Sequence, residues 1–126
     1  MDAYMDTNVA VRLALGDIRK ITKPAQQAME RYDLLISPMA LLELQYLFEI
    51  GLLAAPASQA LAHLQEAVGL AVCRLPFADI AHAACNEAWT RDVFDRVIVA
   101  HARYAPNAPL ITADTNIQNH YEHAIW

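Results

Sequence analysis

The feature that most constrains the fold is the alternation of short apolar segments with longer helical ones. Apolar segments of strand character lie at residues 4–5, 34–36, 71–75, 110–112 and 123–126. The periodicity predicts helices at residues 9–15, 24–32, 37–50, 57–68, 79–88, 93–104 and 115–121, with a loop at 17–23. Short buried strands separated by helices are typical of a parallel sheet covered on both faces, so we expect an α/β fold.

The size and composition of the chain fit one globular domain over residues 1–126. The chain is 56% hydrophobic and only 18% charged, which excludes a disordered protein and leaves apolar surface that a partner or a second copy could cover. No apolar run reaches the roughly 20 residues of a membrane span, and residues 1–6 do not resemble a signal peptide. We expect Cys73 and Cys85 to be buried reduced thiols and the protein to be cytoplasmic.

Two aspartates follow predicted strands directly. Asp6 comes after Tyr4-Met5, and Asp114 comes after the segment that contains Leu110 and Ile111. Ligands of open parallel sheets bind at the carboxyl ends of the strands, so both side chains should reach one crevice. Either aspartate alone would be explained as a helix N-cap.

Three more acids lie on predicted helices. Glu43 has apolar neighbours at three and four residues, namely Met39, Ala40, Tyr46 and Leu47. A buried carboxylate without a partner is unfavourable, so we expect a cation or a wet cleft beside Glu43, unless its side chain simply reaches solvent. Asp92 and Asp95 bracket the start of the helix at 93–104, where Asp92 fits an N-cap and Asp95 is left free to project outward.

If Asp6, Glu43, Asp95 and Asp114 converge, they require cations. Two carboxylates about 4 Å apart repel by roughly 4 kcal/mol at an effective dielectric of 20. Oxygen ligands without thiolates favour Mg²⁺ or Mn²⁺ over Zn²⁺. Carboxylates that hold such an ion together with phosphate oxygens are typical of metal-assisted phosphodiester hydrolysis.

The ordered set of these segments resembles the PIN-domain ribonucleases, and among them most closely the VapC-type toxins of toxin–antitoxin pairs. The matching segments are Asp6-Thr7-Asn8-Val9, Ser37-Pro38 with Glu43-Leu44, Arg91-Asp92-Val93-Phe94-Asp95-Arg96 leading into 98–102, and Leu110-Ile111-Thr112-Ala113-Asp114. They follow the family's order and spacing over nearly the whole chain. Val93 departs from the pattern, which more often has proline there.

The resemblance implies a three-layer α/β/α sandwich and an RNA-cleaving activity. It implies a Mg²⁺ or Mn²⁺ site made by Asp6, Glu43, Asp95 and Asp114, with the hydroxyl of Thr7 nearby and Asp92 accompanying Asp95. It also implies a homodimer and inhibition by an antitoxin protein.

An acidic protein that binds RNA needs basic residues near its acidic site. The net charge is −5, which by itself argues against a general nucleic-acid-binding surface. The candidates for RNA contacts are Arg12, Arg19, Lys20 and Lys23 in or near the first loop, and Arg91 and Arg96 beside the aspartates. Scattered solvated charges would explain the same residues.

Two other sets of side chains have bland explanations. His101, His120 and His123 lack the cysteine or histidine spacing of a metal site, so we expect ordinary histidines. The apolar helical hairpin that contains Leu47, Phe48, Ile50, Leu52 and Leu53 is expected to be internal core, and a groove for a partner helix or a dimer contact is the alternative.

Two alternative functions share the α/β fold and the clustered acids. A non-catalytic, Mg-binding signalling module of the receiver type would need a lysine late in the chain, and none follows Lys23. A phosphatase of the haloacid-dehalogenase type would need an aspartate at position 8, where this chain has Asn8. Covalent phosphorylation of Asp6 would separate either alternative from a nuclease.

Overall fold

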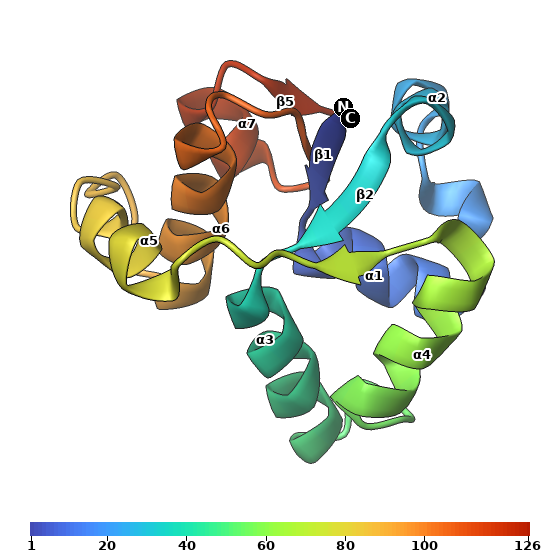
Figure 1. Cartoon of the computed structure of the whole chain (residues 1–126). Helices are drawn as coiled ribbons and strands as arrows, with labels where there is room; N and C mark the ends of the chain where they lie inside the picture. The colour runs from blue at the N-terminus through green and yellow to red at the C-terminus, as the bar shows by residue number, and fades with distance from the viewer.

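A five-stranded sheet forms the centre of the protein (Figure 1), whose computed structural model describes residues 1–126. The strands are β1 (Asp2–Met5), β2 (Asp33–Ile36), β3 (Ala71–Val72), β4 (Leu110–Ile111) and β5 (Ala124–Ile125). They lie in the order β3-β2-β1-β4-β5, and every neighbouring pair is parallel. The predicted α/β fold with a parallel sheet is confirmed.

Helices cover both faces of this sheet. They are α1 (Thr7–Ala14), α2 (Lys23–Arg31), α3 (Pro38–Glu49), α4 (Ala57–Val68), α5 (Phe77–Ala84), α6 (Val93–Tyr104) and α7 (Thr115–His120), with a short 3₁₀ turn η1 (Ile18–Lys20). The chain crosses the sheet in one direction from β1 to β3 and in the other from β3 to β5. Because such crossovers are right-handed, their helices cover opposite faces. Figure 1 shows α5, α6 and α7 on one side of β1 and α1, α2 and α4 on the other, which confirms the three-layer sandwich.

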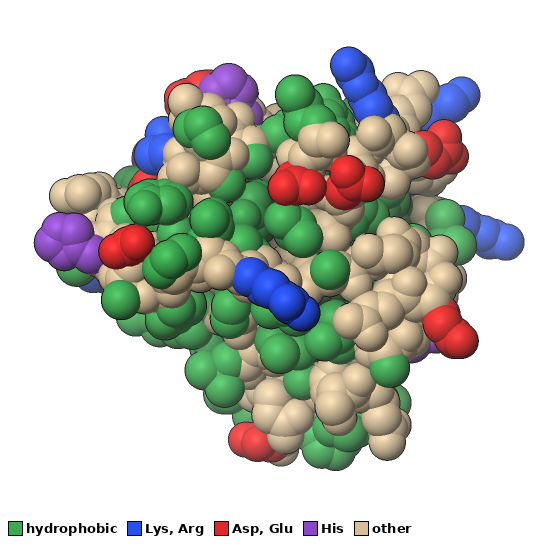
Figure 2. Space-filling model, viewed as in Figure 1, with side chains coloured by type: hydrophobic (Ala, Val, Ile, Leu, Met, Phe, Trp, Pro, Cys, Tyr) green, Lys and Arg blue, Asp and Glu red, His purple; other side chains and the backbone are tan.

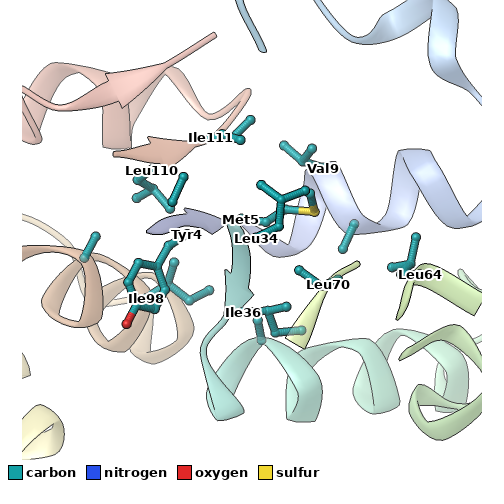
Figure 3. Packing of buried hydrophobic residues seen from close by; sticks show 14 of the residues in the cluster. Tyr4, Met5, Val9, Leu34, Ile36, Leu64, Leu70, Ile98, Leu110 and Ile111 are labelled. Atoms are coloured by element: carbon teal, nitrogen blue, oxygen red, sulfur yellow. The ribbon is translucent and has the colours of Figure 1, made fainter. Parts of the chain in front are cut away.

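The central strand is buried on both faces. Tyr4 and Met5 are each 1% exposed, and successive side chains of a strand point to opposite faces. Figure 3 shows Tyr4 beside Ile98 of α6, while Met5 lies on the side of Val9 in α1. One strand therefore joins the two helical layers.

Most predicted element boundaries agree with the structure, and two segments are shorter than expected. The strand predicted at 71–75 ends at Val72, and the helix predicted at 79–88 is α5, which begins at Phe77 and ends at Ala84. Pro76 immediately precedes that helix, where a proline is well tolerated, so the helix starts early and residues 85–92 form a connection to α6.

Two expectations about burial need correction. Cys73 is buried, but Cys85, just after the last turn of α5, is exposed, so only one of the two thiols is in the interior. The apolar hairpin is also only partly internal. Leu53 is buried, whereas Ile50 is 50% exposed and Leu52 is 66% exposed.

Exposed apolar side chains gather on two parts of the surface. Figure 2 shows hydrophobic side chains over α5 and beside α3. The exposed large side chains of these two helices include Leu42 and Tyr46 of α3 and Phe77 of α5, and Val93 is exposed at the start of α6. No helix combines the length and apolar character needed to cross a membrane.

Candidate functional site

An acidic cavity of about 270 Å³ lies at the carboxyl-terminal edge of the sheet. Its lining residues are Asp6, Thr7, Asn8, Glu43, Leu47, Asp92, Asp95 and Asp114. The chain leaves β1 and β4 toward opposite faces, and the crevice beyond such a pair of strands is where open α/β sheets bind ligands. The structure thus brings all six predicted catalytic residues into one cavity from four separated parts of the sequence.

Asp6 is the most constrained of the acids. The residue is 4% exposed, and its carboxylate accepts hydrogen bonds from the Thr7 amide at 2.7 Å and the Thr112 hydroxyl at 2.6 Å. Its own amide donates to the Ile111 carbonyl at 2.9 Å, which ties the end of β1 to β4. Burial raises the pKa of Asp6 to about 6, although the two hydrogen bonds act in the opposite direction.

Thr112 is a site residue that the sequence reasoning did not select. Besides donating to Asp6, its hydroxyl accepts a hydrogen bond from the Asp114 amide at 3.1 Å. Its side chain therefore links the acids that follow β1 and β4. The available signal was a polar hydroxyl at the end of an apolar strand, two residues before Asp114.

Glu43 projects from α3 toward the strand-end aspartates, as its apolar helix neighbours predicted. Burial raises the pKa of Glu43, and Asp6 and Asp92 raise it further. The Thr7 hydroxyl opposes this rise, although it makes no hydrogen bond of normal geometry. Glu43 is half-buried at the cavity wall, so the explanation that it simply reaches open solvent is wrong.

Asp95 carries the largest accumulation of nearby negative charge. Burial raises its pKa to about 7, and repulsion by Asp92, Asp6, Asp114 and Glu43 adds to the effect. Four neighbouring carboxylates destabilise the ionised form of Asp95, and the protein places no cationic side chain in the cavity to offset them.

Three of the acids also cap helices whose first turns begin at the cavity. Asp6 caps α1, Asp92 accepts from the Asp95 amide at 3.1 Å at the start of α6, and Asp114 caps α7. The predicted capping roles are therefore present together with the shared cavity. The positive ends of three helix dipoles offset part of the repulsion between the carboxylates.

The lining groups fit a hard divalent cation. All polar side chains of the cavity present oxygen donors, and two buried oxygen atoms, Oγ1 of Thr7 and Oδ1 of Asn8, have no hydrogen-bond partner. No three acidic, histidine or cysteine side chains are close enough to chelate an ion directly. That arrangement suits Mg²⁺, which keeps several water ligands and binds through one or two carboxylates.

The six predicted RNA-contacting residues lie outside the cavity lining. Arg91 and Arg96 donate to the backbone carbonyls of Ala88 and Thr90, so they fasten the connection that precedes α6. Lys20 pairs with Asp17 at 3.0 Å. Arg19 and Lys23 are exposed, and Arg12 contacts the C-terminal Trp126. Their binding to RNA stays a prediction.

Two of the histidines lie against aromatic rings. His101 is fully buried between the rings of Tyr4 and Phe77, and burial lowers its pKa to about 4. His120 stacks on Trp89 with ring centroids 4.8 Å apart.

Solved structures of similar fold cover nearly the whole chain. A toxin–antitoxin complex from Klebsiella pneumoniae aligns with a TM-score of 0.62 and 19% identity, covering 98% of this chain and 96% of that one. VapBC2 from Rickettsia felis, bound to a DNA fragment from its promoter, aligns with a TM-score of 0.60 and 18% identity over 94% and 92% of the two chains. PAE2754 from Pyrobaculum aerophilum aligns with a TM-score of 0.59 and 17% identity over 99% and 88%. At these identities the likeness shows the fold.

A family model decides the relationship. No protein of curated function is significantly similar in sequence to this chain. The model of the PIN domain matches residues 3–123, which include every acid of the cavity. Because the match covers nearly the whole chain, it excludes both alternative families, the receiver modules and the haloacid-dehalogenase-like phosphatases. The chain belongs to the PIN-domain family.

Proposed function

We propose that this protein is a metal-dependent endoribonuclease, which hydrolyses RNA phosphodiester bonds with Mg²⁺ or Mn²⁺ held directly or through bound water by Asp6, Glu43, Asp95 and Asp114. The observation that carries the proposal is the convergence of these carboxylates in one cavity, where burial and mutual repulsion raise the pKa of three of them. Such a cluster is stable in the ionised form only beside cations. Membership in the PIN family, whose members are generally nucleases, supports the hydrolysis of nucleic acid.

Some side chains of the cavity would bind the metal ion, and others would orient water or substrate. A bound divalent cation would polarise the phosphoryl oxygen and lower the pKa of a bound water. Asp6 is held in place by Thr7 and Thr112 and is therefore pre-organised as a ligand. The unpartnered oxygens of Thr7 and Asn8 are available to orient water or substrate at the same wall.

Conservative substitutions test the assignment. Asp6→Asn, Glu43→Gln, Asp95→Asn and Asp114→Asn should each nearly abolish Mg²⁺-dependent cleavage of a panel of cellular RNAs, while circular dichroism shows an intact fold. Asp79→Asn removes an exposed acid of α5 that lies outside the cavity and should leave cleavage unchanged. Full activity in any two of the four site variants would refute the proposal.

The preference for RNA over DNA needs a direct comparison. Single-stranded oligonucleotides of identical sequence, one of RNA and one of DNA, should differ in cleavage rate, with RNA cut faster. Equal cleavage would leave a nuclease but remove the ribonuclease assignment.

We also propose that the protein is a VapC-type toxin that acts in the cytoplasm and is inhibited by an antitoxin. One of the structures with a similar fold is a toxin–antitoxin complex by name, and another is VapBC2. The exposed side chain of Leu15 lines a hollow of about 290 Å³ together with Leu53, and most of the lining is apolar. This hollow offers an apolar partner segment a place to bind. Expression in a bacterial host should arrest growth, and Asp6→Asn should relieve the arrest. A small open reading frame upstream of the gene is the first antitoxin candidate, and its product should copurify and inhibit.

A homodimer is the oligomeric state that we propose. The exposed apolar side chains of α3 and α5 provide surface that association would bury. Sedimentation equilibrium of the purified chain should give twice the monomer mass, and a monomer at all concentrations would contradict the dimer.

A further inference from the structure

A fixed arginine lies at the same edge of the sheet as the acidic cavity. The guanidinium of Arg12 lies over the ring of Trp126, 5.0 Å from its centroid. The Nη1 atom of Arg12 also donates to the Lys20 carbonyl at 3.0 Å. None of the protein's ion pairs includes Arg12, so its charge is held in position without being neutralised.

Hydrogen bonds connect the strand that precedes Trp126 to the acids of the cavity. Trp126 directly follows β5, and the carbonyl of its neighbour Ile125 accepts from the Thr112 amide at 3.1 Å. Thr112 in turn donates to Asp6. Because β5 is two strands away from β1, the ring of Trp126 begins about 10 Å from Asp6 along the sheet edge.

The charge of this region is opposite to that of the cavity. Arg19 and Lys20 lie in η1, whose end is fastened to Arg12. RNA approaching a group of carboxylates is repelled unless its neighbouring phosphates meet cations. A guanidinium with a fixed plane presents a fork of donors that matches a phosphate group.

We propose that Arg12, oriented by Trp126, binds a backbone phosphate of the substrate strand a few nucleotides from the phosphate in the acidic cavity. This inference rests on the proposed nuclease function and adds a path for the RNA, which runs from the cavity past the ends of β4 and β5 toward η1. Trp126 is a positioning residue in this arrangement, because its ring fixes the plane of the guanidinium.

The salt dependence of RNA binding tests the phosphate contact. Fluorescence anisotropy of a labelled single-stranded RNA, measured with Ca²⁺ in place of Mg²⁺ and with the RNA checked for integrity on a gel, gives the dissociation constant at several salt concentrations. Arg12→Gln should weaken binding roughly tenfold. It should also reduce the slope of log affinity against log salt by about 0.7, the value for one phosphate of a single strand.

Matched variants separate positioning from folding. Trp126→Leu should lower both affinity and slope, and Trp126→Phe should restore them, because phenylalanine keeps an aromatic face for the guanidinium. Arg31→Gln is the control, since Arg31 also lies over an aromatic ring, that of Tyr32 at 5.5 Å, but at the end of α2 and outside the lining of the acidic cavity. It should change neither quantity. If Arg12→Gln does not fold, the pair of Trp126 variants decides the question.

Three outcomes would overturn the inference. An unchanged slope in folded Arg12→Gln would show that the arginine only fastens η1 to the C-terminus. An equal loss in Arg31→Gln would show a general charge effect. If the wild type cleaves RNA and Arg12→Gln has the same salt slope as the wild type, this inference alone fails. If the wild type binds no RNA, the proposed function fails as well.

Discussion

At the scale of single residues, the hydroxyl of Thr112 stabilises the ionised carboxylate of Asp6 and holds it in position. It supplies one of only two hydrogen bonds that the protein makes to that carboxylate, and Asp6 is 4% exposed. Thr112→Val keeps the shape and removes the donor. We expect it to lower the free energy of unfolding by about 1–3 kcal/mol at neutral pH, as for other buried bonds to a charged group.

Urea denaturation measures this effect, and Thr112→Ser is the matched control. Serine keeps the hydroxyl and should restore most of the stability. Equal stability of the wild type and Thr112→Val would mean that the bond to Asp6 contributes nothing to the fold.

Asp95 gives a prediction with the opposite sign. Its pKa in the folded protein is about 7, well above its ordinary value of 3.8, so folding favours the protonated form. Without metal, stability should therefore fall as the pH rises from about 4 to 7. Asp95→Asn removes this penalty, and in EDTA at about pH 8 it should be more stable than the wild type by on the order of 1 kcal/mol, a value reduced for partial solvation.

Thermal melts in EDTA across this pH range check the prediction. The advantage of Asp95→Asn should vanish below about pH 4, where the wild-type carboxyl is protonated in both states. A variant that is less stable than the wild type at high pH would contradict the role of charge repulsion.

At the scale of elements, a buried carboxylate braces the connection between α5 and α6. Glu87 is 5% exposed and accepts from the Trp89 indole at 2.6 Å and from Nε of Arg103 at 2.7 Å. Arg103 also donates to the His120 carbonyl at the end of α7. The hydrogen bonds of Glu87 and Arg103 therefore join the segment that leads to Asp92 with α7, the helix that Asp114 caps.

Glu87→Gln should loosen this connection. It leaves Arg103 without its buried partner, and we expect a loss of about 1–3 kcal/mol in stability, below the full value for buried pairs because the arginine is partly exposed. Hydrogen exchange should accelerate in residues 85–92. Glu122→Gln is the control, because that exposed acid lies 3.8 Å from the same arginine and should change stability by less than about 0.5 kcal/mol.

At the scale of the whole molecule, the acidic cavity couples metal binding to stability. A ligand that binds only the folded state stabilises it, by about 2.7 kcal/mol at a hundredfold excess over Kd. Saturating Mg²⁺ should therefore raise the melting temperature, whereas KCl of matched ionic strength should raise it much less.

Site variants identify where the ion acts. Asp6→Asn and Glu43→Gln should lose most of the stabilisation by Mg²⁺, and Asp79→Asn should keep it. Equal stabilisation of the wild type and the site variants would place the ion outside the cavity.

The sequence by itself determined the local elements and the chemistry of the acids. Ser37 caps α3 and Asp92 caps α6, as their positions relative to the helices predicted. The apolar neighbours of Glu43 predicted its burial, and the ends of the apolar strands predicted where Asp6 and Asp114 lie. These features depend on residues a few positions apart, so the sequence carries them directly.

Only the tertiary structure decided the contacts between distant parts of the chain. The bond between Thr112 and Asp6 spans 106 positions, and the contact of Arg12 with Trp126 depends on β5 joining the sheet beside β4. Strand order and crossover direction fix such contacts, and neither leaves a local pattern. The exposure of Cys85 was missed for the same reason, because burial depends on what packs against a segment and not on its own apolar character.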